Sequence, residues 1–281
     1  MTGVQTCALP ICLTLAYISH RSAGGPVPRS VIVVHRLDNG GDHEIPLTLR
    51  RVDPVPLRWS PDGLEMLVRG ADSHGRAGAF IVRVEGGAVS PGVLVPETHV
   101  TDVAQARWWI DGRSIAYVSP RGLVVRERGS QIERVMFDPS SARPPLRLVN
   151  FELASDGRSL AIAAVVSGTE PPVRELLVTA LGGVPSAVTR AIFPNQVFLQ
   201  TWMPDGRELL FTQRDARVAG PHALWRAPLD GVPRDPGIRI PGFTQINMIQ
   251  VDPGGKRLAY TADQSSWDLW VLEHFLPGMG P

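Results

Sequence analysis

Cysteine and lysine are almost missing from this sequence, and so are long apolar runs. The 281 residues contain two cysteines, both within the first twelve positions, and 27 of the 28 basic residues are arginine. Two cysteines this close to one end cannot build a disulfide framework or a four-ligand zinc site. No run of about 18 apolar residues occurs, so no membrane-spanning helix is predicted.

Neither sign of charge is in excess. The formal net charge is +1, which argues against a strong electrostatic footprint for nucleic acid or for an anionic membrane. The arginines are scattered, as expected from a GC-rich bacterial genome. The seven histidines show no metal-ligand spacing, and neither a nucleophile elbow nor a phosphate-binding loop is present. We therefore predict no catalytic residue, no metal and no cofactor.

The first eleven residues, MTGVQTCALPI, resemble the translation of a sequencing-library adapter. A segment that derives from an adapter is not part of the natural protein and carries no information about its fold. Residues 1–11 are therefore interpreted as an artefact that contains Cys7 and adjoins Cys12. The rest of the chain is interpreted as an N-terminally truncated fragment of a bacterial protein.

Glycine and proline, by contrast, are abundant and fall between short apolar runs. Five segments share one pattern: LRWSPDGLEMLV, ARWWIDGRSIAYV, FELASDGRSLAIA, QTWMPDGRELLFT and IQVDPGGKRLAYT. Their turn glycines are Gly63, Gly112, Gly157, Gly206 and Gly255, with spacings of 49, 45, 49 and 49 residues. Leu15-Ala16-Tyr17 aligns with Leu258-Ala259-Tyr260 and marks a sixth copy.

Each copy holds about four strand-like runs separated by Gly-Gly or Asp-Gly turns. Four antiparallel strands in 45 to 50 residues, repeated, are typical of a propeller blade. We predict an all-β fold, a six-bladed β-propeller of four-stranded antiparallel blades, with the first and last blades incomplete. The expected domain covers 12–276 and is followed by a tail, 277–281. Its predicted blades are 12–52, 53–102, 103–147, 148–196, 197–245 and 246–276.

The W-x-PDG motif, followed by an apolar strand and a later Asp-Gly or Gly-Gly hairpin, resembles the TolB-like propeller repeat, a WD40-like repeat. The best copies are WSPDG at Trp59–Gly63 and WMPDG at Trp202–Gly206. The resemblance covers the chain from Leu13 to Phe275. It implies a binding protein outside the cytoplasm, with the periplasm favoured.

The repeated turn residues have two interpretations. In the first, the aspartates form a ring of carboxylates that binds a metal or acts in acid–base chemistry. In the second, which is favoured, each Asp side chain accepts hydrogen bonds from backbone amides of its turn, and each Gly takes a positive φ. The predicted structural turns are Asp62, Gly63, Asp111, Gly112, Asp156, Gly157, Asp205, Gly206, Gly254 and Gly255. Trp59, Trp109 and Trp202 are predicted to pack between blades, and Trp108 is a candidate ligand contact.

The favoured function is that of a non-catalytic interaction or scaffold module. It would bind a protein, peptide or glycan partner through loops such as Gly70–Gly78 and Arg214–Pro221. The chain is expected to be a monomer and not an enzyme. Two alternatives stay open: a C-terminal sensor domain of a longer kinase or transcriptional regulator, and a propeller lyase or hydrolase with a channel site.

Overall fold

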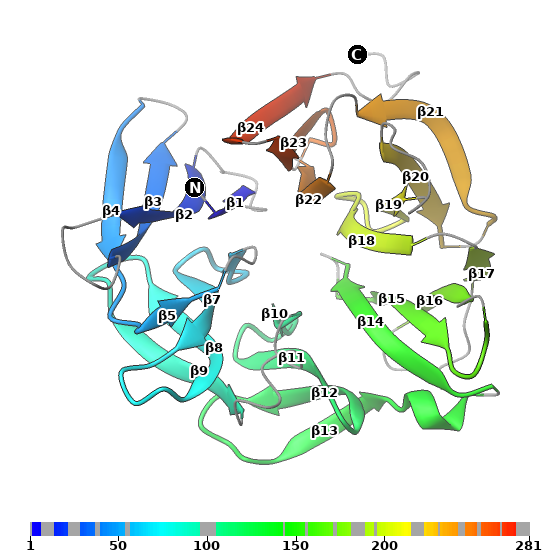
Figure 1. Ribbon diagram of the computed structural model, residues 1–281, viewed down its shortest axis with the longest axis horizontal. Helices are drawn as coiled ribbons and strands as arrows, with labels where there is room; N and C mark the ends of the chain where they lie inside the picture. Colours follow the sequence, from blue (N-terminus) through cyan, green and yellow to red (C-terminus); the bar gives the residue numbers. More distant parts are fainter. Residues whose placement is uncertain are drawn as a thin grey trace. The chain divides into compact units, whose positions relative to one another are not determined.

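The structure is a computed structural model (Figure 1). It describes residues 2–6, 14–21, 29–36, 40–53, 57–95, 105–142, 144–154, 157–170, 173–180, 189–193, 196–214, 222–229, 231–240, 245–251, 254–264 and 266–273. These residues form antiparallel strands and one short 3-10 helix, η2 (Pro139–Ser141). The chain divides into two compact units. Unit 1 comprises Met1–Pro120 and Val124–Arg134, and unit 2 comprises Arg121–Leu123 and Val135–Pro281.

Unit 1 contains three sheets in chain order, and its boundary with unit 2 passes through the third. The first sheet consists of β1 (Thr2–Thr6), β2 (Thr14–Arg21), β3 (Arg29–Arg36) and β4 (Asp42–Pro46). In the second sheet, β5 (Arg51–Val52) and β6 (Arg58–Trp59) both pair with β7 (Glu65–Ala71), which is followed by β8 (Ala77–Arg83) and β9 (Val89–Val95). The third sheet consists of β10 (Arg107–Trp108), β11 (Ser114–Ser119), β12 (Gly122–Glu127) and β13 (Glu133–Phe137).

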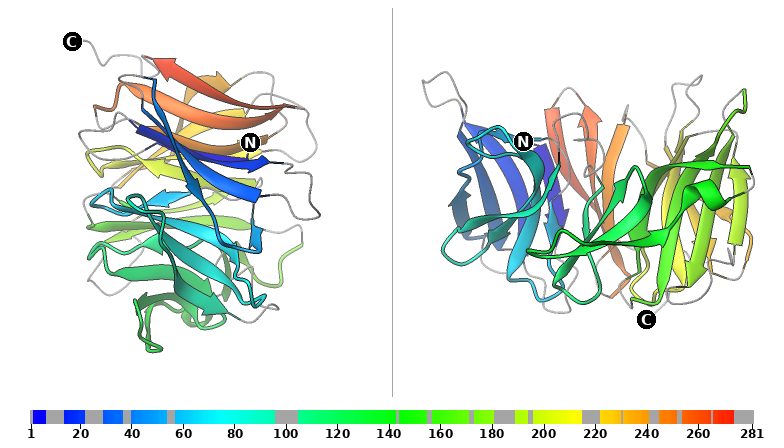
Figure 2. Two further views of the ribbon diagram at one scale, coloured as in Figure 1. Left: turned by 90° about the vertical axis from the view of Figure 1, so that its left-hand side faces the viewer. Right: turned by 90° about the horizontal axis from the view of Figure 1, so that it is seen from below.

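Unit 2 repeats this plan. Its first sheet consists of β14 (Leu146–Leu153), β15 (Ser159–Val166), β16 (Arg174–Ala180) and β17 (Thr189–Phe193). The next consists of β18 (Gln196–Trp202), β19 (Glu208–Arg214), β20 (His222–Pro228) and β21 (Arg234–Ile240). The last holds β22 (Gln245–Val251), β23 (Arg257–Gln264) and β24 (Ser266–Glu273). Figure 2 shows from the side how the strands run back and forth within each sheet.

The all-β fold and the propeller arrangement of four-stranded antiparallel sheets are confirmed. The predicted number of blades is wrong, because the described residues form five four-stranded blades, with β5 and β6 sharing one strand position. The last sheet has three described strands. The first blade was expected to be incomplete, yet β1 pairs with β2 from Thr2↔Ile18 to Thr6↔Leu15 and gives it a fourth strand.

The apolar cores lie between neighbouring sheets of each unit. In β7, Met66 and Val68 pack with the first sheet, and Leu67, which points the other way, packs with the third. In unit 2, Leu209 and Phe211 face one cluster while Leu210 faces another. Side chains alternate across a strand, so a sheet covered on both faces needs apolar residues at consecutive positions. This explains continuous apolar runs such as Met66–Val68 and Leu209–Phe211, which burial of one face alone would not.

Candidate functional site

One turn geometry recurs between the first two strands of the repeat. In the second sheet the N–H of Ser60 donates to the oxygen of Glu65 at 2.7 Å, and the N–H of Gly63 donates to the oxygen of Ser60 at 2.9 Å. The same pair of bonds forms around the turn glycines Gly112, Gly157 and Gly206. These glycines have φ between 64° and 72°, which other residues rarely adopt. The turns therefore form a rigid, repeated edge within each unit.

The aspartates of these turns are held by local donors. Asp62 Oδ1 accepts from the N–H of Leu64 at 3.0 Å and from the Ser60 hydroxyl at 2.6 Å. Asp111 and Asp205 accept in the same way from backbone N–H groups two residues later, of Arg113 and Arg207. The Ser60 hydroxyl and the Leu64 N–H lower the pKa of Asp62. Asp156 and Asp252 lie outside the described residues, whereas Gly254 follows β22 in the last turn.

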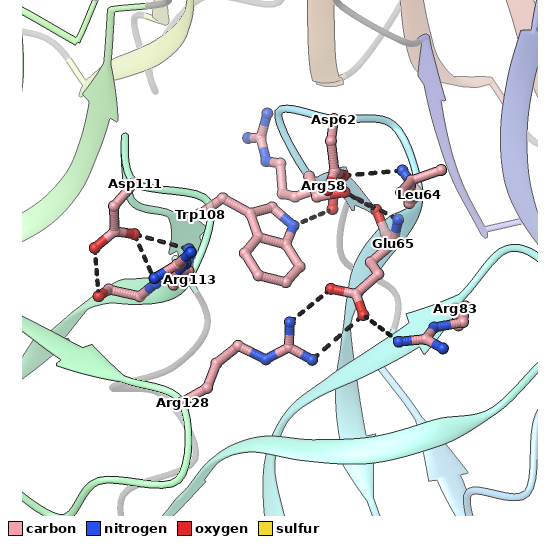
Figure 3. Close-up of polar contacts among 11 residues, drawn as sticks. Arg58, Asp62, Leu64, Glu65, Arg83, Trp108, Asp111, Arg113 and Arg128 are labelled. Atoms are coloured by element: carbon pink, nitrogen blue, oxygen red, sulfur yellow. Dashed lines mark hydrogen bonds and ion pairs between the residues drawn. The ribbon is translucent and has the colours of Figure 1, made fainter.

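Trp108 packs between the second and third sheets. It lies four residues before its turn glycine, as Trp59 and Trp202 do, whereas Trp109 lies three before. Its side chain is buried in the core, and its indole N–H donates to the oxygen of Arg58 at 3.0 Å (Figure 3). Trp202 makes the matching bond to the oxygen of Glu152 at 3.0 Å. Trp108 thus occupies the packing position that was expected for Trp109. Its indole ring is buried and does not offer an open surface to a ligand.

The other two tryptophans differ from this pattern. Trp59 is half-buried against the core between the first and second sheets, and its buried Nε1 has no hydrogen-bond partner in the described part of the chain. Trp109 is buried too, but it serves the turn through its backbone, donating to Ser114 and accepting from Gly112.

An ion-pair network joins the second and third sheets beneath the turns. Arg128 donates to both carboxylate oxygens of Glu65, at 2.8 and 3.3 Å, and Arg83 lies 3.8 Å from the same carboxylate (Figure 3). The Arg128 guanidinium also stands 5.8 Å from the centre of the Trp108 ring. Glu65 is buried, and a buried carboxylate needs such compensation. In unit 2 the equivalent Glu208 pairs with Arg226 and Arg234.

Two exposed apolar side chains stand on the turns above this network. Leu64 is 58% exposed and Ile110 is 51% exposed. Their turns are neighbours, because a Cβ built at Gly112 would lie 4.0 Å from Cδ of Pro61, which is itself exposed. We call Pro61, Leu64, Ile110 and the exposed Arg113 the turn surface. The W-x-PDG motif does not predict this surface, although the sequence holds one signal for it: the position of Leu64 is basic in the other four repeats (Arg113, Arg158, Arg207 and Lys256).

The predicted contact loops have different outcomes. Gly70 and Gly78 lie inside β7 and β8 and face each other in register, so the loop itself is confined to 72–76. Residues 215–221 of the second loop lie outside the described residues. No group of three or more His, Cys, Asp or Glu side chains arranged for a metal ion occurs among the residues that the structure describes.

The comparisons with known proteins show the fold. No family model matches the chain, and no curated protein matches it. TolB from Acinetobacter baumannii aligns with a TM-score of 0.65 and 14% identity over 92% of this chain. A putative TolB from Agrobacterium tumefaciens aligns with 0.61 and 12% identity, covering 87% of this chain and 85% of its own. This chain spans 60% of the length of the Acinetobacter protein. The chain therefore has a TolB-like β-propeller fold.

The prediction that the chain is not an enzyme is corrected by a third similar structure. An acylaminoacyl peptidase from Pyrococcus horikoshii aligns with a TM-score of 0.54 and 11% identity, covering 97% of this chain and 45% of its own. Because the same fold occurs within an enzyme, the fold does not exclude catalysis.

Proposed function

We propose that this chain binds a protein or peptide partner through the turn surface of unit 1. The observation that carries the proposal is the pair of large apolar side chains, Leu64 and Ile110, held more than half exposed on two adjacent rigid turns. Single exposed apolar residues are ordinary, but a group of them rimmed by polar residues marks an interaction site.

Rigidity supports this proposal. Each turn is closed by two backbone hydrogen bonds and by its aspartate, so an incoming partner does not have to order it. Binding to a pre-organised surface avoids much of the entropy cost of association. The exposed Arg113, three residues after Ile110 on the same turn, can supply orientation through hydrogen bonds to carbonyl or carboxylate groups of the partner.

A displayed peptide library tests the proposal. Peptides selected on the wild-type protein should lose at least about tenfold in affinity for a Leu64→Asp, Ile110→Asp double variant, since that is the effect of about 1.4 kcal/mol. The matched control is Val232→Asp, which alters a side chain 84% exposed in unit 2 and should leave binding unchanged. The melting temperatures of both variants should equal that of the wild-type protein, so that a change in affinity reflects binding and not unfolding.

Unchanged affinity in the double variant would contradict the proposal, as would selected peptides that respond equally to the control. A glycan array gives a further test. If the double variant binds glycans as well as the wild-type protein does, glycan recognition belongs to another surface, and this result would also count against the proposal.

We further propose that residues 12–276 act as one propeller domain, as a monomer and in the periplasm. The TolB-like fold supports this assignment. Within the described ranges, no helix is long and apolar enough to cross a bilayer.

A further inference from the structure

Arginines adjoin both turns of the turn surface. At the turn of the second sheet, the N–H of Val84 donates to the backbone oxygen of Leu64 at 2.9 Å, so Arg83, the residue before Val84, lies next to this turn. At the turn of the third sheet, the N–H of Arg128 donates to the backbone oxygen of Arg113 at 3.3 Å. Backbone hydrogen bonds therefore hold an arginine beside each of the two exposed apolar side chains.

Two of these arginines share one carboxylate. Arg83 is paired in register with Glu65, and residues that are paired in this way point to the same face of a sheet. Arg128 donates to the same carboxylate from the third sheet at 2.8 Å (Figure 3). The side chain of Glu65 is 11% exposed, whereas that of Arg83 is 65% exposed. The carboxylate is thus enclosed, and the more exposed guanidinium group stands toward solvent.

Arg113 adds a guanidinium group that has no partner. Its side chain is exposed and makes no ion pair or hydrogen bond with the residues that the structure describes. Its backbone is fixed, because its N–H donates to Oδ1 of Asp111 at 2.8 Å and its oxygen accepts from Arg128. The side chain therefore extends from a rigid turn, and its five N–H donors remain for an acceptor from outside.

The aspartate of the same turn is bonded inside the protein. Oδ1 of Asp111 accepts from the N–H groups of Arg113 and Ser114, and Oδ2 accepts from the Ser114 hydroxyl. Burial raises the pKa of Asp111, but the bonds from Ser114 and Arg113 and the charge of Arg134 lower it by more, so Arg134 also lies near this turn. The formal charge of the ionisable side chains considered so far is four minus three, or +1: Arg83, Arg113, Arg128, Arg134, Asp62, Glu65 and Asp111.

Two exposed glutamates close by in the chain face elsewhere. Glu127 precedes Arg128 at the end of β12, and neighbouring side chains of a strand point to opposite faces of its sheet. Glu85 belongs to the hairpin between β8 and β9, where a Cβ at Gly87 would lie 3.2 Å from Cγ2 of Ile45 in the first sheet. The positive charge beside the apolar pair therefore exceeds the negative charge.

We propose that the partner of the turn surface is an acidic peptide segment, in which Asp or Glu side chains flank an apolar residue. This inference rests on the proposed function and names the chemistry of the partner. The apolar residue packs on Leu64 and Ile110, and the carboxylates accept paired hydrogen bonds from the guanidinium groups of Arg83 and Arg113. Such charge complementarity speeds association and excludes basic segments.

Peptides selected on the wild-type protein from a displayed library test the inference at 0.1 M salt. Those that lose affinity for a Leu64→Ala, Ile110→Ala double variant, which keeps the charge of the protein, bind the turn surface. These peptides should be rich in Asp and Glu and should bind more weakly as salt is added. Arg113→Gln should weaken their binding by at least about tenfold, the scale of one lost charge-assisted hydrogen bond. Since this side chain has no bond with the described residues, the melting temperature should not change.

Arg50→Gln is the matched control. Arg50 is exposed in the same unit, makes no ion pair or hydrogen bond with the described residues, and has its Nη1 3.7 Å from the Cβ position of Gly75, beyond the far end of β7. The seven residues of β7 span about 20 Å, which exceeds the Debye length of about 10 Å at 0.1 M salt. The control should therefore leave the affinity unchanged.

The outcomes separate this inference from the proposed function. Peptides that depend on Leu64 and Ile110 but are not acidic, or that keep their affinity for Arg113→Gln, would overturn the inference and leave the proposed function standing. Selected peptides that do not depend on Leu64 and Ile110 would overturn both. An equal loss in Arg50→Gln would trace the effect to the overall charge of the protein and would also overturn the inference.

Discussion

Three tryptophans occupy the same position of the repeat but differ in what the indole N–H meets. Trp108 and Trp202 each donate to a carbonyl of the preceding sheet, 50 residues earlier in the chain. Trp59 is half-buried, and its buried Nε1 has no acceptor among the described residues. A buried donor without a partner costs free energy, whereas a satisfied one contributes to stability. The three positions therefore contribute differently to the stability of the fold.

Phenylalanine substitutions measure this difference. Trp202→Phe should lower the free energy of unfolding by about 1–2 kcal/mol, because it leaves the Glu152 carbonyl without this donor. Trp59→Phe should change it by less than about 0.5 kcal/mol, since no bond with the described residues is lost. Urea denaturation followed by circular dichroism gives both values. An equal loss at both positions would show that Trp59 also donates, to an acceptor outside the described residues.

Asp62 makes its turn sensitive to acid. Its pKa is lowered below 3.8 in the folded protein by the Ser60 hydroxyl and the Leu64 N–H. A group whose pKa is depressed by folding contributes stability above the unfolded pKa, and that contribution is lost as the pH falls through the folded value. Ser60→Ala should raise the pKa of Asp62. Its stability deficit relative to wild type should therefore shrink as the pH falls from about 7 to below 3.8.

Denaturation curves at several pH values test this, with Ser130→Ala as control. The Ser130 hydroxyl accepts from the N–H of Ile132 and bonds to no carboxylate of the residues that the structure describes, so the deficit of Ser130→Ala should not depend on pH. A deficit in Ser60→Ala that stays constant with pH would show that the Asp62 carboxylate does not depend on this hydroxyl.

Two glycines of the second sheet lie where a neighbouring strand leaves no room for a Cβ atom. A Cβ built at Gly78 in β8 would lie 2.0 Å from the backbone oxygen of Val93 in β9, and one at Gly70 in β7 would lie 2.1 Å from that of Arg51. Backbone oxygens cannot move aside without opening the strand pairing. These two glycines, which face each other in register, therefore permit the close packing of the second sheet.

Alanine at Gly78 and at Gly86 should separate steric from conformational effects. Gly86 lies in a hairpin with φ at +77° and no atom within 4 Å of its Cβ position. Gly86→Ala should cost about 1 kcal/mol, the strain of a left-handed backbone. Gly78→Ala should cost more than about 3 kcal/mol, because the β8–β9 pairing must open. Thermal unfolding compares them, and a small loss at Gly78 would contradict the close approach.

The chain as a whole repeats its inter-sheet contacts in both units. Besides the tryptophan bonds, a proline of one turn lies beside the turn glycine of the next sheet, Pro61 by Gly112 in unit 1 and Pro204 by Gly255 in unit 2. Proteins built this way draw stability from each repeat and from its interfaces with neighbours. The proposed turn surface uses positions where one copy departs from the others, Leu64 and Ile110.

The sequence by itself determined the all-β class, the repeat of antiparallel strands and the Asp-Gly turns. Every bond that closes such a turn joins residues at most five apart, so local residue types specify it. The tertiary structure alone decided that the indole of Trp108 donates to Arg58 of the preceding sheet and that Arg128 reaches Glu65 across 63 residues. Such contacts depend on how neighbouring sheets pack, and motif spacing within one repeat carries no information about that packing.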